Sequence, residues 1–370
     1  MKILLLSCST GEGHNHCAAA AREALEQNGC TVEFLDMLHM FGDPGPLSFD
    51  KILNRICTRK PELFGMMYHA GEMFSASGVT SPVYIANIRH AVQLGDFIRA
   101  NGYDAVLCSH LFPMETLTYL RRRGECPPPC YGILSDYTCI PFLAETGMEA
   151  YFLPHDDVRA ACVDAGMPAE RLLVTGMPVS AKFSLPISRE EARRTLSIPA
   201  DKKLYLIMTG GIGCGDALSL CDAIRAVPDE RALLYVLAGR NEELRAALDE
   251  RYAGQNVRAL PFTDQVHVYM RAADVLLSKA GGISSSEAAV SGVPLVHTMV
   301  IPGVETLNAE FFAARGMSFF ARSPAEAARY ADRLVFDAYT RGRMLEAQHT
   351  QIPADGAQRI ADIVLRGLRG

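Results

Sequence analysis

The hydrophobic positions of this chain fall into short apolar runs that alternate with segments of helical length. Buried parallel strands have this appearance, since both of their faces are covered and Val, Ile and Leu follow one another almost without interruption. Alternating strands and helices predict an α/β protein with doubly wound parallel sheets. The apolar runs lie at 3–8, 32–36, 105–109, 131–135, 150–153, 172–175, 204–208, 232–238, 257–260, 275–278, 294–298 and 317–320.

The length of 370 residues exceeds what one hydrophobic core usually serves, so two domains are expected. Glycine and proline interrupt the periodicity between residues 176 and 199. We therefore expect a first domain over 1–178, a linker over 179–199 and a second domain over 200–354. Residues 355–370 predict a helix that could pack back on the first domain.

Residues 43–82 contain no strand pattern and predict a helical insertion in the first domain. Lys51, Arg55 and Arg59 recur every four residues, with Lys60 beside them and apolar residues alongside. A basic helix with apolar flanks can lie on an anionic membrane surface. A helix packed on the domain, with its basic side in water, explains the pattern equally well.

Two glycine-rich turns follow apolar strands about 270 residues apart. The first reads Gly11-Glu12-Gly13-His14, and the second reads Lys279-Ala280-Gly281-Gly282. A strand, a tight glycine turn and a helix N-terminus present backbone N–H groups to an anion. The pair predicts a phosphate-bearing ligand held between two domains.

Composition narrows the class of protein further. The formal net charge of −6 gives no support to nucleic-acid binding. The eleven cysteines form no CxxC pair, which favours a reducing cytoplasm, and no metal site is expected. No apolar stretch reaches the 18 residues that a membrane span requires.

Two residues are candidates for acid–base chemistry. His14 stands at the start of the first predicted helix, where the helix N-terminus disfavours imidazolium. A neutral imidazole can accept a hydroxyl proton, or it can cap the helix and contact phosphate. Asp136 ends a predicted strand at the carboxyl edge of the sheet, where open α/β sheets bind ligands. The alternative interpretation is that Asp136 is only a turn residue, since aspartate is common in turns.

The ordered motifs resemble those of the monogalactosyldiacylglycerol synthase-like and processive diacylglycerol glucosyltransferases, family 28 glycosyltransferases related to MurG. The resemblance runs from about residue 1 to 320. Besides the two glycine turns, it rests on Ser109-His110-Leu111-Phe112-Pro113, Ser135-Asp136-Tyr137, Thr175-Gly176-Met177-Pro178-Val179, Gly239-Arg240-Asn241, Ser286-Glu287 and Ile301-Pro302-Gly303.

This resemblance implies a GT-B fold, in which two Rossmann-like domains face a cleft. It implies a hexosyltransferase that moves a hexose from a UDP-sugar, with inversion, to a lipid such as diacylglycerol. The product would be a β-glycolipid. No cofactor or bound metal would be needed, and the protein would be peripheral to the inner face of the cell membrane. His14 and Asp136 become rival catalytic bases.

The resemblance also implies the residues that bind the donor. Glycine turns and serines would surround the diphosphate, Glu287 would hold the ribose hydroxyls, and backbone atoms after the strand at 257–260 would edge the uracil. The expected donor-binding residues are Gly11, Gly13, Gly210, Gly211, Gly213, Arg240, Phe262, Thr263, Gly281, Gly282, Ser284, Ser285, Glu287, Glu305 and Asn308.

Two departures from the family pattern leave the sugar and the acceptor open. Ile140 stands where the family has a histidine, and Val304 stands where it has a glutamine. A valine cannot make the hydrogen bonds of a glutamine to sugar hydroxyls, so sugar preference should change. The alternatives are a non-lipid acceptor, a UDP-sugar 2-epimerase, and a non-catalytic protein that binds sugar nucleotides.

Overall fold

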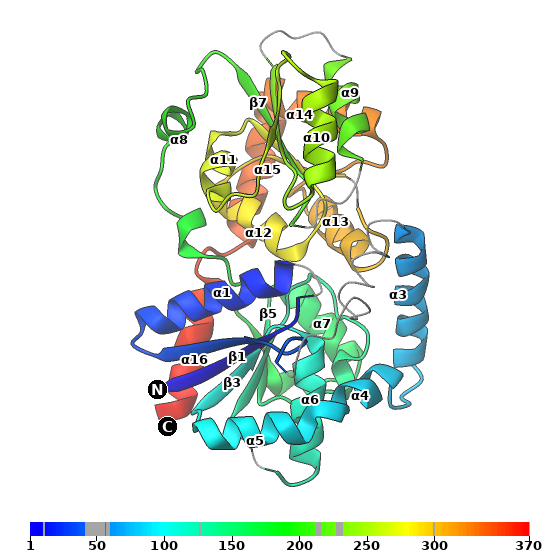
Figure 1. Cartoon of the computed structure of the whole chain (residues 1–370), viewed down its shortest axis with the longest axis vertical. Helices are drawn as coiled ribbons and strands as arrows, with labels where there is room; N and C mark the ends of the chain where they lie inside the picture. Colours follow the sequence, from blue (N-terminus) through cyan, green and yellow to red (C-terminus); the bar gives the residue numbers. More distant parts are fainter. Residues whose placement is uncertain are drawn as a thin grey trace. The chain divides into compact units, whose positions relative to one another are not determined.

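The computed structural model describes residues 1–9, 12–40, 56, 60–125, 127–211, 216–226, 232–298 and 300–369. Two six-stranded parallel sheets form, with strand orders β2-β1-β3-β4-β5-β6 and β12-β11-β10-β7-β8-β9 (Figure 1). The strands are β1 (Lys2–Ser7), β2 (Thr31–Asp36), β3 (Ala105–Cys108), β4 (Cys130–Ile133), β5 (Ala150–Leu153), β6 (Leu172–Val174), β7 (Lys203–Met208), β8 (Ala232–Leu237), β9 (Val257–Leu260), β10 (Val275–Ser278), β11 (Leu295–His297) and β12 (Phe319–Phe320).

Helices connect successive strands in both halves. They are α1 (Glu12–Gln27), α3 (Pro61–Ser75), α4 (Pro82–Asn87), α5 (Ala91–Asn101), α6 (Leu111–Arg122), α7 (Asp156–Asp164), α8 (Arg189–Thr195), α9 (Ala217–Arg225), α10 (Glu242–Arg251), α11 (Val266–Ala272), α12 (Gly282–Ser291), α13 (Val304–Ala314), α14 (Pro324–Phe336), α15 (Ala338–Gln351) and α16 (Gly356–Arg369), with 3₁₀ turns η2 (Ile88–His90), η3 (Leu143–Glu145), η4 (Ala169–Arg171) and η5 (Ala181–Phe183).

The sequence prediction of an α/β fold with doubly wound parallel sheets is confirmed. Each expected strand is present, with ends that differ from the prediction by two residues at most. The central strands of both sheets are fully buried, as their uninterrupted apolar sequences require.

The chain divides into two compact units, Met1–Ser180 with Ala354–Gly370, and Ala181–Pro353. In the first unit, α1 and α16 pack together and cover one face of the sheet, while α5 and α6 lie on the other (Figure 1). Apolar residues of α16, including Ile360 and Val364, join the same core as Ile3 and Leu5 of β1. The C-terminal helix is therefore part of the first unit.

In the second unit, α9 and α14 pack together on one face of the sheet, and their apolar residues share a core with β7, β8 and β10. The first strand of each unit, β1 or β7, lies inside its sheet, so the strand order reverses beside it. These reversal points, between β1 and β3 and between β7 and β10, are where open α/β sheets bind ligands.

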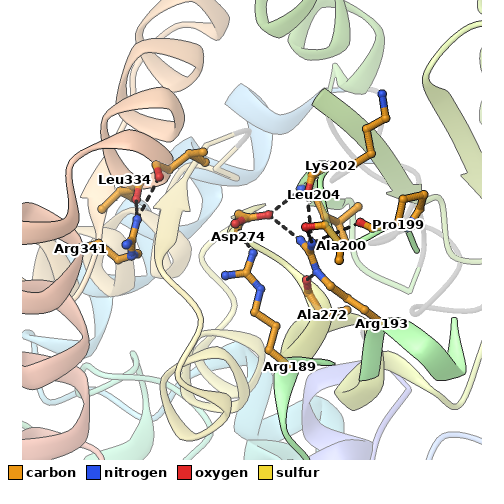
Figure 2. A network of polar contacts seen from close by, with 11 residues as sticks. Arg189, Arg193, Pro199, Ala200, Lys202, Leu204, Ala272, Asp274, Leu334 and Arg341 are labelled. Atoms are coloured by element: carbon orange, nitrogen blue, oxygen red, sulfur yellow. Dashed lines mark hydrogen bonds and ion pairs between the residues drawn. The ribbon is translucent and has the colours of Figure 1, made fainter. Parts of the chain in front are cut away.

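The stretch expected to be a linker, 179–199, contains η5 and α8. Ser188 and Glu191 form a capping box at the start of α8. Arg193 of α8 is buried; its guanidinium contacts the Asp274 carboxylate at 2.7 Å and donates to the Ala272 carbonyl oxygen (Figure 2). These contacts fasten α8 to the second unit, at the N-terminal end of β10.

Most of the first part of the predicted insertion lies outside the described residues, including Lys51, Arg55 and Arg59. The described part forms α3 from Pro61 to Ser75, with Lys60 at its N-cap. It is helical, as the sequence predicts.

Candidate functional site

His14 is placed at the carboxyl edge of the first sheet, where β1 and β3 are neighbours. It lies in the first turn of α1, the helix that follows β1. Its Nδ1 atom is 2.8 Å from the carbonyl oxygen of Ser109, the residue that follows β3. A carbonyl oxygen can only accept a hydrogen bond, so Nδ1 carries the proton and Nε2 carries the lone pair. The described residues form no hydrogen bond to Nε2.

Side-chain contacts fix the start of α1, where His14 lies. Asn15 is hydrogen-bonded to Ser7 Oγ at 2.7 Å and to Ser9 Oγ at 3.1 Å, and the Ser9 amide donates to the Asp36 carboxylate. These bonds tie the start of α1 to the ends of β1 and β2. The imidazole is thereby held at one position on the sheet edge.

Ser135 and Asp136 approach His14 from the end of the neighbouring strand β4. Ser135 Oγ lies 3.1 Å from His14 Nδ1 and 3.1 Å from Asp136 Oδ2. The two rival candidates from the sequence are therefore brought to one site, joined through a serine. Apolar and polar residues line a small pocket there: His14, Ser109, His110, Leu111, Met114, Ile133, Leu134, Ser135, Asp136, Thr138, Ile140 and Leu143.

The surroundings keep the histidines of this pocket neutral. Desolvation lowers the pKa of His14, and the nearby Asp136 carboxylate opposes that shift. Burial also lowers the pKa of His110 well below its usual value, and the His14 charge acts in the same direction. The two rings meet edge to face, with centroids 4.5 Å apart. A neutral His14 can act as a base at neutral pH.

Helix α3 packs on the loop that follows Asp136. The Phe142 amide donates to Ser75 Oγ at 3.0 Å, and the Phe142 ring meets Phe74 edge to face. Phe142 has φ 68°, an uncommon conformation for a residue with a side chain. On the same helix, the Asp136 charge contributes to a raised pKa of the Tyr68 phenol, so Tyr68 lies near that carboxylate. The α3 helix thus supports the Asp136 loop.

The second reversal point holds a lysine in place of a histidine. Lys279, directly after β10, forms an ion pair with Glu305 of α13, and Glu305 Oε2 accepts from the Ile301 amide at 3.0 Å. The aliphatic part of the Lys279 side chain packs against Gly210, which follows β7. A Cβ atom on Gly210 would lie 2.5 Å from Lys279 Cε, and its φ of 77° also favours glycine.

Helix α12 begins after the short turn that follows β10. Gly281 is its N-cap, and no side chain of the described residues caps it. Backbone N–H groups of Gly282, Ile283 and Ser284 therefore belong to the first turn, where helices bind anions. Ser285 differs from the expectation, because its hydroxyl bonds to the Gly281 carbonyl and to His297 Nε2, at 2.8 and 2.9 Å, inside the unit.

The remaining expected donor residues lie either on helices α12 and α13 or just after strands β8 and β9. Asn308 is buried and donates to the Ala280 carbonyl at 3.0 Å, while Glu287 is buried on α12. Arg240 stacks over the exposed Phe262 ring, with its guanidinium carbon 4.5 Å from the centroid. Arg240 also donates its backbone N–H to the Gly211 carbonyl, so the ends of β7, β8 and β9 lie together. Thr263 Oγ accepts from the Gln265 amide.

Gly13 lies in the first turn of α1, whereas Gly11 and Gly213 lie outside the described residues. Sequence reasoning quoted Ser135 and Lys279 only as parts of motifs and gave them no role. It missed His297 altogether, since a single histidine at the end of an apolar strand carries no motif.

Two protein-family models and the shared fold of a solved structure define the class of this protein. Residues 14–179 match the model for monogalactosyldiacylglycerol (MGDG) synthase, and residues 215–319 match that for the glycosyltransferase family 28 C-terminal domain. The fold is shared with MurG from Acinetobacter baumannii, at TM-score 0.64 and 17% identity, over 99% of each chain. The chain is a glycosyltransferase of the GT-B class.

The relatives in sequence are more specific. A processive diacylglycerol beta-glucosyltransferase from Bacillus cytotoxicus is 26% identical over 371 residues, which cover 98% of this chain and 93% of the relative. The resemblance predicted from the motifs is confirmed. A UDP-GlcNAc 2-epimerase from Neisseria meningitidis, solved with UDP-GlcNAc, also shares the fold, at TM-score 0.58 and 14% identity over the whole of both chains. The fold alone therefore does not select the reaction.

Among the described residues, no helix is both long enough and apolar enough to cross a bilayer.

Proposed function

We propose that this protein transfers a hexose from a UDP-sugar to diacylglycerol and forms a β-linked glycolipid. The observation that carries the proposal is the pairing of His14 with Asp136 inside the segment similar to MGDG synthase. The second reversal point, with its uncapped helix and lysine, lies within the segment similar to family 28.

In the proposed reaction, His14 Nε2 accepts the proton of the free diacylglycerol hydroxyl. The hydroxyl oxygen attacks the anomeric carbon, and the bond from that carbon to the phosphate oxygen breaks. The bonding electrons leave with UDP, and attack from the opposite face inverts the anomeric centre. Asp136 stabilises the imidazolium that forms on His14.

The donor would be held at the end of β10. The N–H groups of the first α12 turn would bind the diphosphate, and the Lys279 ammonium would balance part of its charge. Glu287 would bind the ribose hydroxyls. This arrangement supplies the charge balance of UDP departure from backbone and side chains, so we propose a reaction without a bound metal.

We further propose that α3 faces the membrane that supplies the lipid. Five apolar side chains are exposed along it at helical spacing, and they are Leu63, Met66, Met67, Met73 and Phe74. Met66 and Met73 are 71% and 68% exposed. An apolar stripe of this kind can enter the headgroup region of a bilayer, next to the loop that carries Asp136.

The test is UDP release from a panel of UDP-sugars, with and without diacylglycerol in anionic vesicles. Release that requires both one sugar and the lipid, with a β-linked product, would establish the transfer. Met66→Asp with Met73→Asp should reduce vesicle binding and lipid-dependent turnover about tenfold or more, because two apolar contacts become charged. Val92→Asp on α5, 56% exposed in the same unit, is the matched control and should change neither.

Other outcomes decide against the proposal. Sugar epimerisation without an acceptor would favour the epimerase alternative, and turnover with a soluble acceptor alone would exclude the lipid. UDP-sugar binding with no turnover would indicate a binding protein.

A further inference from the structure

Ser135 stands between the two candidate catalytic groups, and its hydroxyl has only one consistent hydrogen-bond assignment. The Asp136 carboxylate can only accept, so the 3.1 Å contact uses the hydroxyl proton of Ser135. His14 Nδ1 already carries a proton, because it donates to the Ser109 carbonyl. The Ser135 oxygen must therefore accept from His14 Nδ1–H at 3.1 Å, sharing that proton with Ser109.

These assignments define a directed chain of hydrogen bonds from imidazole to serine to carboxylate. The chain begins at the ring nitrogen opposite the one proposed to take the substrate proton. When Nε2 becomes protonated, positive charge spreads to Nδ1–H, and the bonds toward Ser135 and Asp136 strengthen. Ser135 is buried, 8% exposed, so water competes little for its hydroxyl.

We propose that Ser135 is a positioning residue that links Asp136 to His14, so that the two groups act as one base. This inference rests on the proposed transfer reaction, and it gives Asp136 an indirect role through Ser135. The other titratable groups near the pair are His110, whose ring meets that of His14, and Tyr68 of α3, which lies near Asp136 and also near Glu72 and Cys139. None of them is hydrogen-bonded to His14 among the described residues.

The first experiment compares Ser135→Thr with Ser135→Val, which have nearly the same shape and differ in the hydroxyl. Ser135→Val should lower kcat about tenfold, the size expected for one hydrogen bond to a developing charge, with the donor KM unchanged. Ser135→Thr should restore kcat to within about threefold of the wild type. Equal losses in both variants would mean that Ser135 only fills space, and the proposal would be wrong.

The second experiment is a double-mutant cycle in kcat with Ser135→Val and Asp136→Asn. If the serine transmits the effect of the carboxylate, the double variant should be no more than about twofold slower than Asp136→Asn alone. Losses that multiply would show that the two residues act separately, which contradicts the link. Ser291→Ala removes a buried hydroxyl of α12 that contacts the Met270 sulfur at 3.8 Å, and it serves as the control for hydroxyl removal.

A third measurement separates this inference from the proposed function. The titration of His14 can be followed by NMR in the free protein, with no substrate present. Ser135→Val should lower the pKa of His14 by about one unit relative to Ser135→Thr, since imidazolium loses an acceptor. This shift is expected even if no sugar is transferred to lipid. An unchanged His14 titration would overturn the link by itself.

Discussion

The two units repeat one strand order, yet the same topological position holds different chemistry in each. Between β1 and β3 it holds an imidazole whose proton can exchange, joined to a serine and a carboxylate. Between β7 and β10 it holds a lysine that is already paired with Glu305. Topology therefore fixes where a ligand meets each sheet, while the residues of the turns decide which part of the reaction each unit serves.

His297 and His14 show the same contrast at the level of single side chains. His297, fully buried in the second unit, is close to a serine hydroxyl at both nitrogens, Ser285 at 2.9 Å and Ser318 at 3.1 Å. His14 uses one nitrogen for Ser109 and Ser135, and the described residues leave the other open. Burial favours the neutral ring at both positions. Only an open nitrogen turns a neutral histidine into a base.

The largest expected effect comes from removing that open nitrogen. His14→Ala should lower kcat for UDP release by about 10²–10⁴-fold, the usual contribution of a positioned general base, with little change in donor KM. Steady-state kinetics with saturating lipid measure both constants. His16→Ala, two residues further along the same helix and exposed, is the control and should retain activity. If kcat of His14→Ala stays within fivefold of the wild-type value, His14 is not the catalytic base.

A second comparison concerns the two ends of β10. The ion pair at the C-terminal end, Lys279 with Glu305, lies at the proposed donor site, whereas the ion pairs at the N-terminal end stabilise the fold. At the N-terminal end, Asp274 is contacted by Arg189 and Arg193 and accepts from the Leu204 amide at 2.7 Å (Figure 2). Asp274→Ala leaves the buried Arg193 guanidinium without its carboxylate and should cost about 3–5 kcal/mol. The unfolding midpoint of the second unit should fall by roughly 6–20 °C.

Differential scanning calorimetry is the suitable measurement, since it can report the two units separately. Glu242→Ala removes an exposed pair with Arg245 on α10 and is the control, with an expected loss of about 1 kcal/mol or less. If both variants lose the same small amount, the Asp274 network contributes no more than a surface pair, and the distinction between the two ends of β10 fails.

The strands and the glycine turn at 279–282 could be predicted from the sequence because each is a local property. A buried parallel strand is a run of apolar residues, and the turn before a helix N-terminus shows its glycines. Helix α8 also has a local sequence signal, the capping box formed by Ser188 and Glu191. The prolines around it led to the prediction of a linker there.

The connections within the site could not be predicted in the same way. The hydrogen bond from His14 to Ser109 joins residues 95 positions apart, and that between His14 and Ser135 joins residues 121 apart. Which way a side chain turns at a strand end depends on such neighbours. Ser285 illustrates this, because it stands in a motif that suggests phosphate binding while its hydroxyl turns inward to His297.

The smallest expected effect tests whether His297 is structural. Burial lowers the pKa of His297 to about 3 in the folded state, against 6.5 for an ordinary histidine. As pH falls below 6.5, the unfolded chain takes up a proton that the folded chain refuses until about pH 3. The contribution to stability is thus complete above pH 6.5 and should fall by about 2 kcal/mol at pH 5.

His297→Gln keeps an amide for the two serines and does not titrate, so it should lose less stability between pH 7 and pH 5 than the wild type. The matched variant His349→Gln, at an exposed position of α15, should show the wild-type loss. Equal acid sensitivity in all three proteins would show that His297 does not take part in this proton uptake, and the contrast with His14 would then rest on kinetics alone.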